Sequence, residues 1–112
     1  MRSLTILALL LAIAAPARGA DILSALYDSR TDSIIVDIAY RGQRPDHDFT
    51  VQWGPCRAGG VAGRLVDEQW KEPARTSFRV TRRLSLEDLP CRPALVTLRL
   101  GRVSHISVEV PG

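Results

Sequence analysis

Apolar and polar residues alternate with a period of two along most of the chain after residue 20. The clearest example is the segment 33–41, in which the even positions are apolar: Ile34, Val36, Ile38 and Tyr40. Side chains that alternate in this way point to opposite faces of an extended strand. The pattern therefore predicts a half-buried β-strand over residues 33–41.

Similar stretches recur along the chain with turn residues between them, while helical spacing is nearly absent. The alternation predicts strands over residues 22–27, 33–41, 49–53, 64–67, 76–84, 94–100 and 103–110. Residues 58–63 are expected to form a glycine-rich loop, and residues 85–89 a single helical turn capped by Ser85. About seven short strands favour an all-β fold, namely an antiparallel immunoglobulin-like sandwich, with a small β-barrel as the alternative.

The first 20 residues break this pattern. A short basic start precedes an apolar run, Leu4–Ala15, which is followed by small residues. That order is typical of a secretory signal peptide, and the run is shorter than the roughly 20 residues that a membrane-spanning helix needs. We therefore expect residues 1–19 to be a cleaved signal and residues 20–112 a single domain without a transmembrane anchor. The domain is expected to be secreted or periplasmic.

The charge balance changes with this processing. The chain has 15 basic and 12 acidic residues, and removal of Arg2 and Arg18 with the signal would lower the formal net charge from +3 to +1. The remaining basic residues are scattered, whereas nucleic-acid binding calls for a clustered basic face. Nucleic acid is therefore not an expected partner.

An exported chain with two cysteines, Cys56 and Cys91, is expected to form a disulfide. Closing a loop of about 36 residues would stabilise a small domain by about 3 to 4 kcal/mol in chain-entropy treatments. If the strands form two sheets, this disulfide would lie across one end of the sandwich.

Asp46, His47 and Asp48 form the densest cluster of titratable side chains in the sequence. An imidazole beside carboxylates offers both a ligand nitrogen and an orienting acceptor. Neighbours on an extended chain point in different directions, so we expect a structural role in which His47 fixes its loop against a strand end. A metal site is the alternative if the fold brings His105 and a carboxylate to His47.

Two further features are candidates for binding. Arg79 and Arg83 share the outward face of one predicted strand, where they could bind an anionic envelope component or instead discourage edge pairing. Trp70 lies in a charged connection, where it could anchor a protein partner or pack as a lid over a sheet.

Residues 40–98 resemble a loose group of small bacterial exported proteins and lipoproteins. The resemblance rests on Tyr40-Arg41-Gly42, His47-Asp48-Phe49, Cys56 and Leu86-x-x-Leu89-x-Cys91. Many members carry Gly-Gly-Cys before the histidine, but residues 42–45 here read Gly-Gln-Arg-Pro, so any bridge through that cysteine is absent. The resemblance implies an exported β-sandwich and no particular activity.

No Gly-x-Ser-x-Gly motif occurs in the sequence, and scattered serines such as Ser77, Ser104 and Ser107 alternate as strand surface residues. We therefore expect a non-catalytic binding or accessory module without a cofactor. Its first candidate surface is the loop cluster around Asp46, His47 and Trp70, with the Arg79 and Arg83 face second. The alternative is a small metal-binding or metal-carrying protein that uses His47, His105 and a carboxylate.

Overall fold

The computed structural model describes residues 19–112, so the predicted signal lies almost entirely outside the described residues. Residues 19–112 form seven β-strands: β1 (Asp21–Asp28), β2 (Ser33–Gly42), β3 (Phe49–Trp53), β4 (Gly60–Asp67), β5 (Thr76–Ser85), β6 (Ala94–Leu100) and β7 (Ser104–Val110). Every strand predicted from the alternation is present. Most boundaries agree within two residues, and β4 is the exception.

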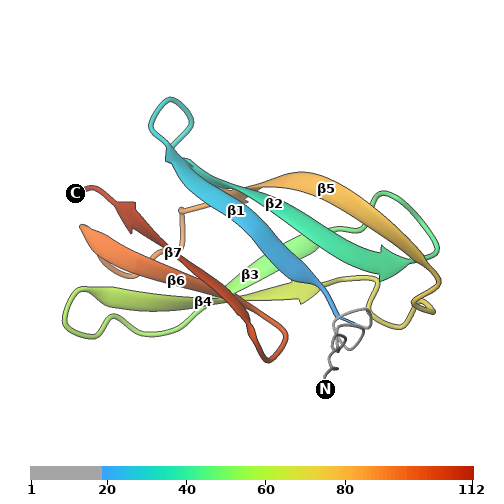
Figure 1. Cartoon of the computed structure of the whole chain (residues 1–112). Coiled ribbons are helices and arrows are strands. Elements are labelled where there is room, and N and C mark those ends of the chain that lie inside the picture. Colours follow the sequence, from blue (N-terminus) through green and yellow to red (C-terminus); the bar gives the residue numbers. More distant parts are fainter. Residues whose placement is uncertain (1–18) are drawn as a thin grey trace, which may run out of the picture.

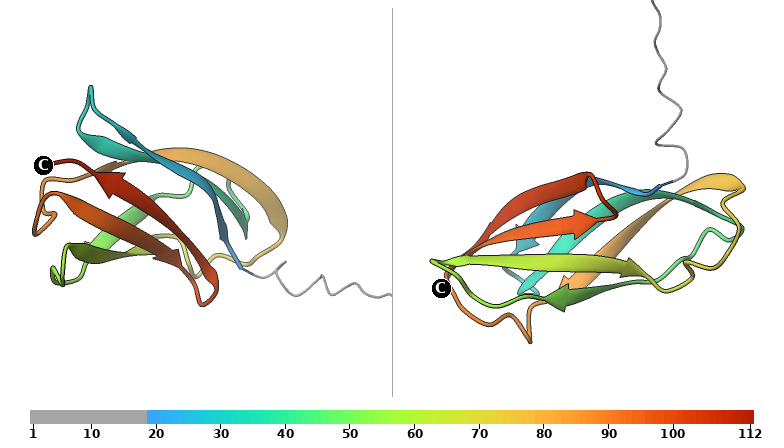
Figure 2. Two further views of the ribbon diagram at one scale, coloured as in Figure 1. Left: turned by 60° about the vertical axis from the view of Figure 1, so that its left-hand side comes forward. Right: turned by 90° about the horizontal axis from the view of Figure 1, so that it is seen from below.

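The strands form two sheets packed face to face, one in the order β1-β2-β5 and the other in the order β3-β4-β6-β7 (Figure 1). This arrangement is a β-sandwich, as predicted, and within residues 19–112 it is not a closed barrel. β1 and β7 meet where the sheets approach each other, and there the backbone N–H of Ile22 donates to Ser104 Oγ at 2.8 Å. The two layers and their crossing directions are visible in Figure 2.

The core lies between the two sheets and consists of the inward positions of the alternating strands. On β2 the side chains of Ile34, Val36 and Ile38 are completely buried. On β6 the alternate residues Val96 and Leu98 are also completely buried. The period of two in the sequence therefore identified the inward faces correctly.

One pairing differs from the all-antiparallel expectation. β4 pairs with β6 in parallel, with Gly60 opposite Leu95 and Arg64 opposite Arg99. In immunoglobulin-type sheets the third strand packs beside the sixth, whereas here β4 takes that place and β3 lies at the edge. The sandwich prediction is confirmed, but its strands are not all antiparallel.

β4 also begins earlier than predicted, at Gly60 rather than Arg64. The glycine-rich stretch is partly strand because Gly63 lies directly opposite Trp53 of β3. A Cβ atom at position 63 would lie 2.6 Å from Trp53 Cζ3, so the indole ring occupies the space of the missing side chain. The turn before β4 has positive φ angles at Ala58 and Gly59, 51° and 80°, as a tight hairpin requires.

The predicted helical turn at residues 85–89 is a non-helical turn. The N–H of Leu89 donates to the carbonyl of Leu86 at 3.1 Å, and the Ser85 hydroxyl accepts from the N–H of Glu87. Two residues further on, Cys91 forms the expected disulfide with Cys56, with 6.0 Å between the Cα atoms. This bond joins the β3–β4 turn to the β5–β6 connection at one end of the sandwich, as predicted.

Candidate functional site

At the end of the sandwich opposite the disulfide, His47 is buried between two carboxylates. The loop 43–48 joins β2 to β3, and its histidine side chain is only 1% exposed. His47 Nδ1 lies 2.8 Å from Asp67 Oδ2, and Nε2 lies 2.7 Å from Glu72 Oε1. We call these three residues the histidine clamp. It ties the β2–β3 loop to the end of β4 and to the β4–β5 connection.

The geometry of the histidine clamp fixes the protonation of His47. An ionised carboxylate only accepts hydrogen bonds, so a ring nitrogen facing one must carry a proton. Burial alone would lower the pKa of His47, but the hydrogen bonds to Glu72 and Asp67 outweigh burial and raise this pKa above 6.5. We therefore expect His47 to be a buried imidazolium at pH values up to about 6.5, with its charge balanced by the two acids.

Glu72 is the most heavily bonded member of the clamp. Besides His47, its carboxylate accepts from the backbone N–H groups of Gln43 and Arg44 and from Arg44 Nε, the last at 2.9 Å. The bond from His47, with those from Gln43 and Arg44, lowers the pKa of Glu72 from 4.5 to about 2. Glu72 thus stays ionised and holds the start of the β2–β3 loop.

The surroundings of His47 are closely fitted to the imidazole ring. The Tyr40 ring stacks on it, with the ring centroids 4.3 Å apart. A Cβ atom at Gly42 would lie 2.6 Å from His47 Cε1, so this position has room for glycine alone. On the backbone side, Arg82 Nη2 donates to the His47 carbonyl oxygen at 2.8 Å, which connects β5 to the same loop.

The β4–β5 connection, residues 68–75, carries Trp70 on its outside. The Trp70 side chain is 68% exposed, and Lys71 Nζ lies 5.3 Å from the centre of its ring. Beside it is a hollow of about 530 Å³ lined by residues of both loops: Gln43, Arg44, Glu68, Gln69, Trp70, Lys71, Glu72 and Pro73. We call these eight residues the loop surface. Trp70 is exposed here and is not a lid over a sheet.

The predicted candidates at this end are only partly brought together. Asp46 and Asp48 are exposed, and the acids that bond His47 are Asp67 and Glu72 instead. The Asp48 N–H donates to Gln69 Oε1 at 2.7 Å, so Asp48 supports the loop through its backbone. The expected structural role of His47 agrees with this geometry, although its partners were missed.

The predicted metal combination is not assembled. His105 lies on β7 and His47 precedes β3, and these strands are the two opposite edges of one sheet. Both ring nitrogens of His47 already face carboxylates. Within residues 19–112, no three His, Cys, Asp or Glu side chains are arranged to hold a metal ion.

The arginines singled out in the sequence are held by acids on the outer face of the β1-β2-β5 sheet. Arg79 Nη2 lies 3.2 Å from Asp37 Oδ2, and Arg83 Nη1 lies 3.2 Å from Asp28 Oδ2. This sheet ends at β5, which carries both arginines. Their contacts are those of ion pairs along an edge strand.

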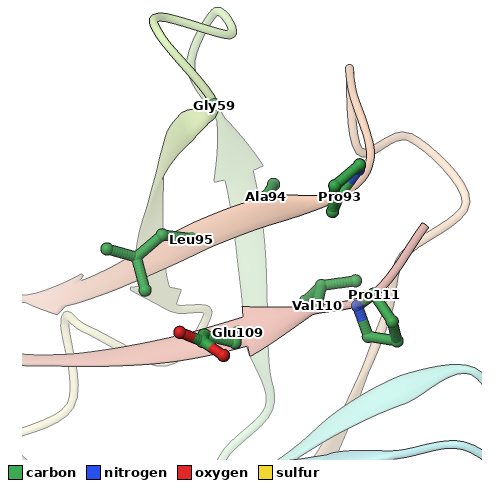
Figure 3. Close-up of a pocket in the computed structure, with 7 residues that line it drawn as sticks. All are labelled: Gly59, Pro93, Ala94, Leu95, Glu109, Val110 and Pro111. Atoms are coloured by element: carbon green, nitrogen blue, oxygen red, sulfur yellow. The ribbon is translucent and has the colours of Figure 1, made fainter.

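A second hollow lies at the disulfide end, against the starts of β4 and β6 and the end of β7 (Figure 3). It has a volume of about 450 Å³ and is lined by Gly59, Pro93, Ala94, Leu95, Glu109, Val110 and Pro111. Leu95 and Glu109 are register partners on neighbouring strands. The hollow contains one carboxylate and otherwise small or apolar side chains.

Comparison of the chain with protein-family models, curated proteins and solved structures found no match. The resemblance to small bacterial exported proteins therefore stays an expectation. In the part of the chain from residue 19 onward, no helix has the length and hydrophobicity to cross a bilayer. The Cys56–Cys91 disulfide is consistent with an oxidising environment.

Proposed function

We propose that this protein is a non-catalytic binding or accessory module that is exported and holds a protein partner on the loop surface. The observation that carries the proposal is the exposure of Trp70 on a connection that is fixed on both sides. The predicted signal and the disulfide support a secreted or periplasmic location. The partner is expected to be a protein because exposed Trp and Arg side chains are enriched in protein interfaces.

The connection that carries Trp70 is held in place by bonds on each side of it. Before Trp70, the Gln69 N–H donates to Asp67 Oδ1 at 2.9 Å. After it, the Glu72 N–H donates to the Gln69 carbonyl at 3.0 Å, and the Glu72 side chain joins the histidine clamp. A loop that is already ordered loses less conformational entropy when it binds a partner. The loop thus holds the Trp70 indole in an exposed position before any partner binds.

Site-specific photo-crosslinking tests this function. A photoreactive phenylalanine analogue would replace Trp70 in the full chain, produced in the cells that naturally make it. The matched control is the same substitution at Val103, which is 82% exposed on the β6–β7 turn. We expect a discrete crosslinked adduct from position 70 and none from position 103. No adduct at position 70, or the same adduct from both positions, would overturn the proposal.

A further inference from the structure

A row of polar side chains crosses the outer face of the β3-β4-β6-β7 sheet. Gln52 is the register partner of Arg64, Arg64 of Arg99, and Arg99 of His105. All four residues are exposed, and each belongs to a different strand. Neighbouring strands are about 4.8 Å apart, so the row runs straight across the sheet with a regular spacing. We call Arg64, Arg99 and His105 the basic row.

Two like charges are directly opposed in this row. Such pairs across neighbouring strands destabilise a sheet. Among residues 19–112, neither Arg64 nor Arg99 forms an ion pair with a carboxylate. Arg64 Nη2 instead donates to Gln52 Oε1 at 2.6 Å, which draws its guanidinium toward β3. The fold therefore carries a repulsion here that no neighbouring acid relieves.

Protection of a sheet edge does not explain the two arginines. β4 and β6 are the central strands of their sheet, and both edges of each are already hydrogen bonded. Arg79 and Arg83 provide the contrast, because they lie on an edge strand and each has a carboxylate partner. Within residues 19–112 the charges of Arg64 and Arg99 are thus not paired with a carboxylate, and both side chains are exposed to a ligand.

On the side toward the disulfide end, the basic row is flanked by small or polar side chains. The next row toward the disulfide end consists of Ala62, Thr97 and Ser107, and the two hydroxyl oxygens of this row are 3.1 Å apart. The acids on this face lie toward its corners. Glu68 bonds Thr50 at one corner, and Glu109 lies opposite Leu95 at the other end (Figure 3).

We propose that the basic row binds a linear acidic polysaccharide, with carboxylates on successive sugars facing Arg64 and Arg99. A guanidinium matches a carboxylate with two parallel hydrogen bonds, and the hydroxyls of the adjacent row can bond those of the sugars. An extended chain suits a row of side chains that runs from strand to strand across the sheet. An anionic membrane is the weaker fit, because its mobile headgroups offer no fixed pair of carboxylates for the two planar guanidinium groups.

Binding of polygalacturonate to the purified domain tests this proposal. The variant Arg64→Gln/Arg99→Gln is compared with Arg79→Gln/Arg83→Gln, which removes the same amount of charge from the opposite sheet. We expect the first variant to weaken binding about tenfold and the second by less than about twofold. Because a repulsion is removed, we also expect the first variant to unfold at a temperature no lower than that of the wild type.

Three results would overturn the proposal. One is the absence of polygalacturonate binding by the wild type, and another is an equal loss in both double variants, which would reflect net charge alone. The third is binding to vesicles that contain phosphatidylglycerol but not to polygalacturonate. The variant Arg64→Lys/Arg99→Lys keeps the charge but lacks the planar guanidinium groups that form two parallel hydrogen bonds. We therefore expect its affinity for polygalacturonate to lie between those of the wild type and the glutamine variant.

Discussion

His47 Nε2 lies 2.7 Å from Glu72 Oε1, and this bond joins two loops that are 25 residues apart in the sequence. One loop leads into β3 and the other carries Trp70. Because the other ring nitrogen of His47 faces Asp67, the imidazole is a charged link between β4 and both loops. The conformation of the loop that carries the exposed Trp70 therefore depends on the buried His47, which holds this loop through Glu72.

Replacing His47 with alanine is expected to destabilise the domain strongly. The change removes the stacking on Tyr40 and takes the imidazolium from between Asp67 and Glu72, of which only Glu72 keeps another cationic partner, Arg44. Removing one partner of a buried ion pair lowers the free energy of unfolding by about 3 kcal/mol. For a domain of this size, that loss corresponds to a fall in melting temperature of about 10 °C or more. Thermal unfolding monitored by circular dichroism measures this change.

The matched control is His105→Ala, because His105 is exposed on β7. A surface substitution of this kind changes stability by less than about 0.5 kcal/mol. Equal melting temperatures for the His47 and His105 variants would show that the histidine clamp contributes nothing to stability.

The stability of the domain is expected to depend on pH in a window set by His47 and Glu72. The pKa of His47 is raised above 6.5, so its contribution is complete below about pH 6.5 and is lost as the pH rises through the higher folded-state value. The pKa of Glu72 falls from 4.5 to about 2, so its contribution is complete above about pH 4.5 and is lost toward pH 2.

Denaturant unfolding of the wild type and of His47→Ala between pH 2 and pH 10 checks this window. We expect the difference in unfolding free energy between them to be largest between about pH 4.5 and pH 6.5 and to shrink on both sides. A difference that grew steadily up to pH 9 would be incompatible with an imidazolium in the clamp.

The glycine at position 42 is expected to be required by the histidine. A Cβ atom there would lie 2.6 Å from His47 Cε1 and 2.8 Å from Glu72 Oε1, so Gly42→Ala should displace the ring and destabilise the domain. In a His47→Ala background the same substitution should cost much less. A double-mutant cycle measured by unfolding gives this coupling directly, and additive effects would contradict the expectation.

Loss of the disulfide is expected to destabilise the domain, while the histidine clamp at the opposite end of the sandwich stays folded. Cys56 and Cys91 are 35 residues apart in sequence, and opening a loop of this length costs about 3 to 4 kcal/mol in chain-entropy treatments. The variant Cys56→Ser/Cys91→Ser should therefore unfold at a lower denaturant concentration. An unchanged midpoint would contradict a stabilising role for this bond.

Local patterns predicted the parts of the fold that depend on neighbouring residues. The alternation around Ile34 to Tyr40 identified β2 and its inward face, and two cysteines in a chain with a predicted signal identified the disulfide. The parallel pairing of β4 with β6 could not be predicted, because it depends on contacts between segments far apart in sequence. The start of β4 was missed because glycines such as Gly63 are typical of loops. The space that Gly63 leaves for the Trp53 ring depends on the register between β4 and β3, which the sequence does not reveal.

The candidate site was predicted at the right histidine with the wrong partners. Asp46 and Asp48 were the obvious acids by position, but Asp67 at the end of β4 and Glu72 in the β4–β5 connection reach His47 from 20 and 25 residues away. One signal was present in the sequence: Arg82 occupies an inward position of β5, between Val80 and Leu84. A charge at such a position calls for a buried partner, and that partner is the His47 carbonyl.

The charge state of His47 tests the central claim most directly. In the purified domain labelled with ¹⁵N, the chemical shifts of Nδ1 and Nε2 report whether each nitrogen carries a proton, and His105 serves as an internal reference for an exposed ring. We expect both His47 nitrogens to be protonated at pH 6.5 and to lose a proton only at higher pH. One unprotonated His47 nitrogen at pH 6.5 would show that the loops are not held by a charged clamp.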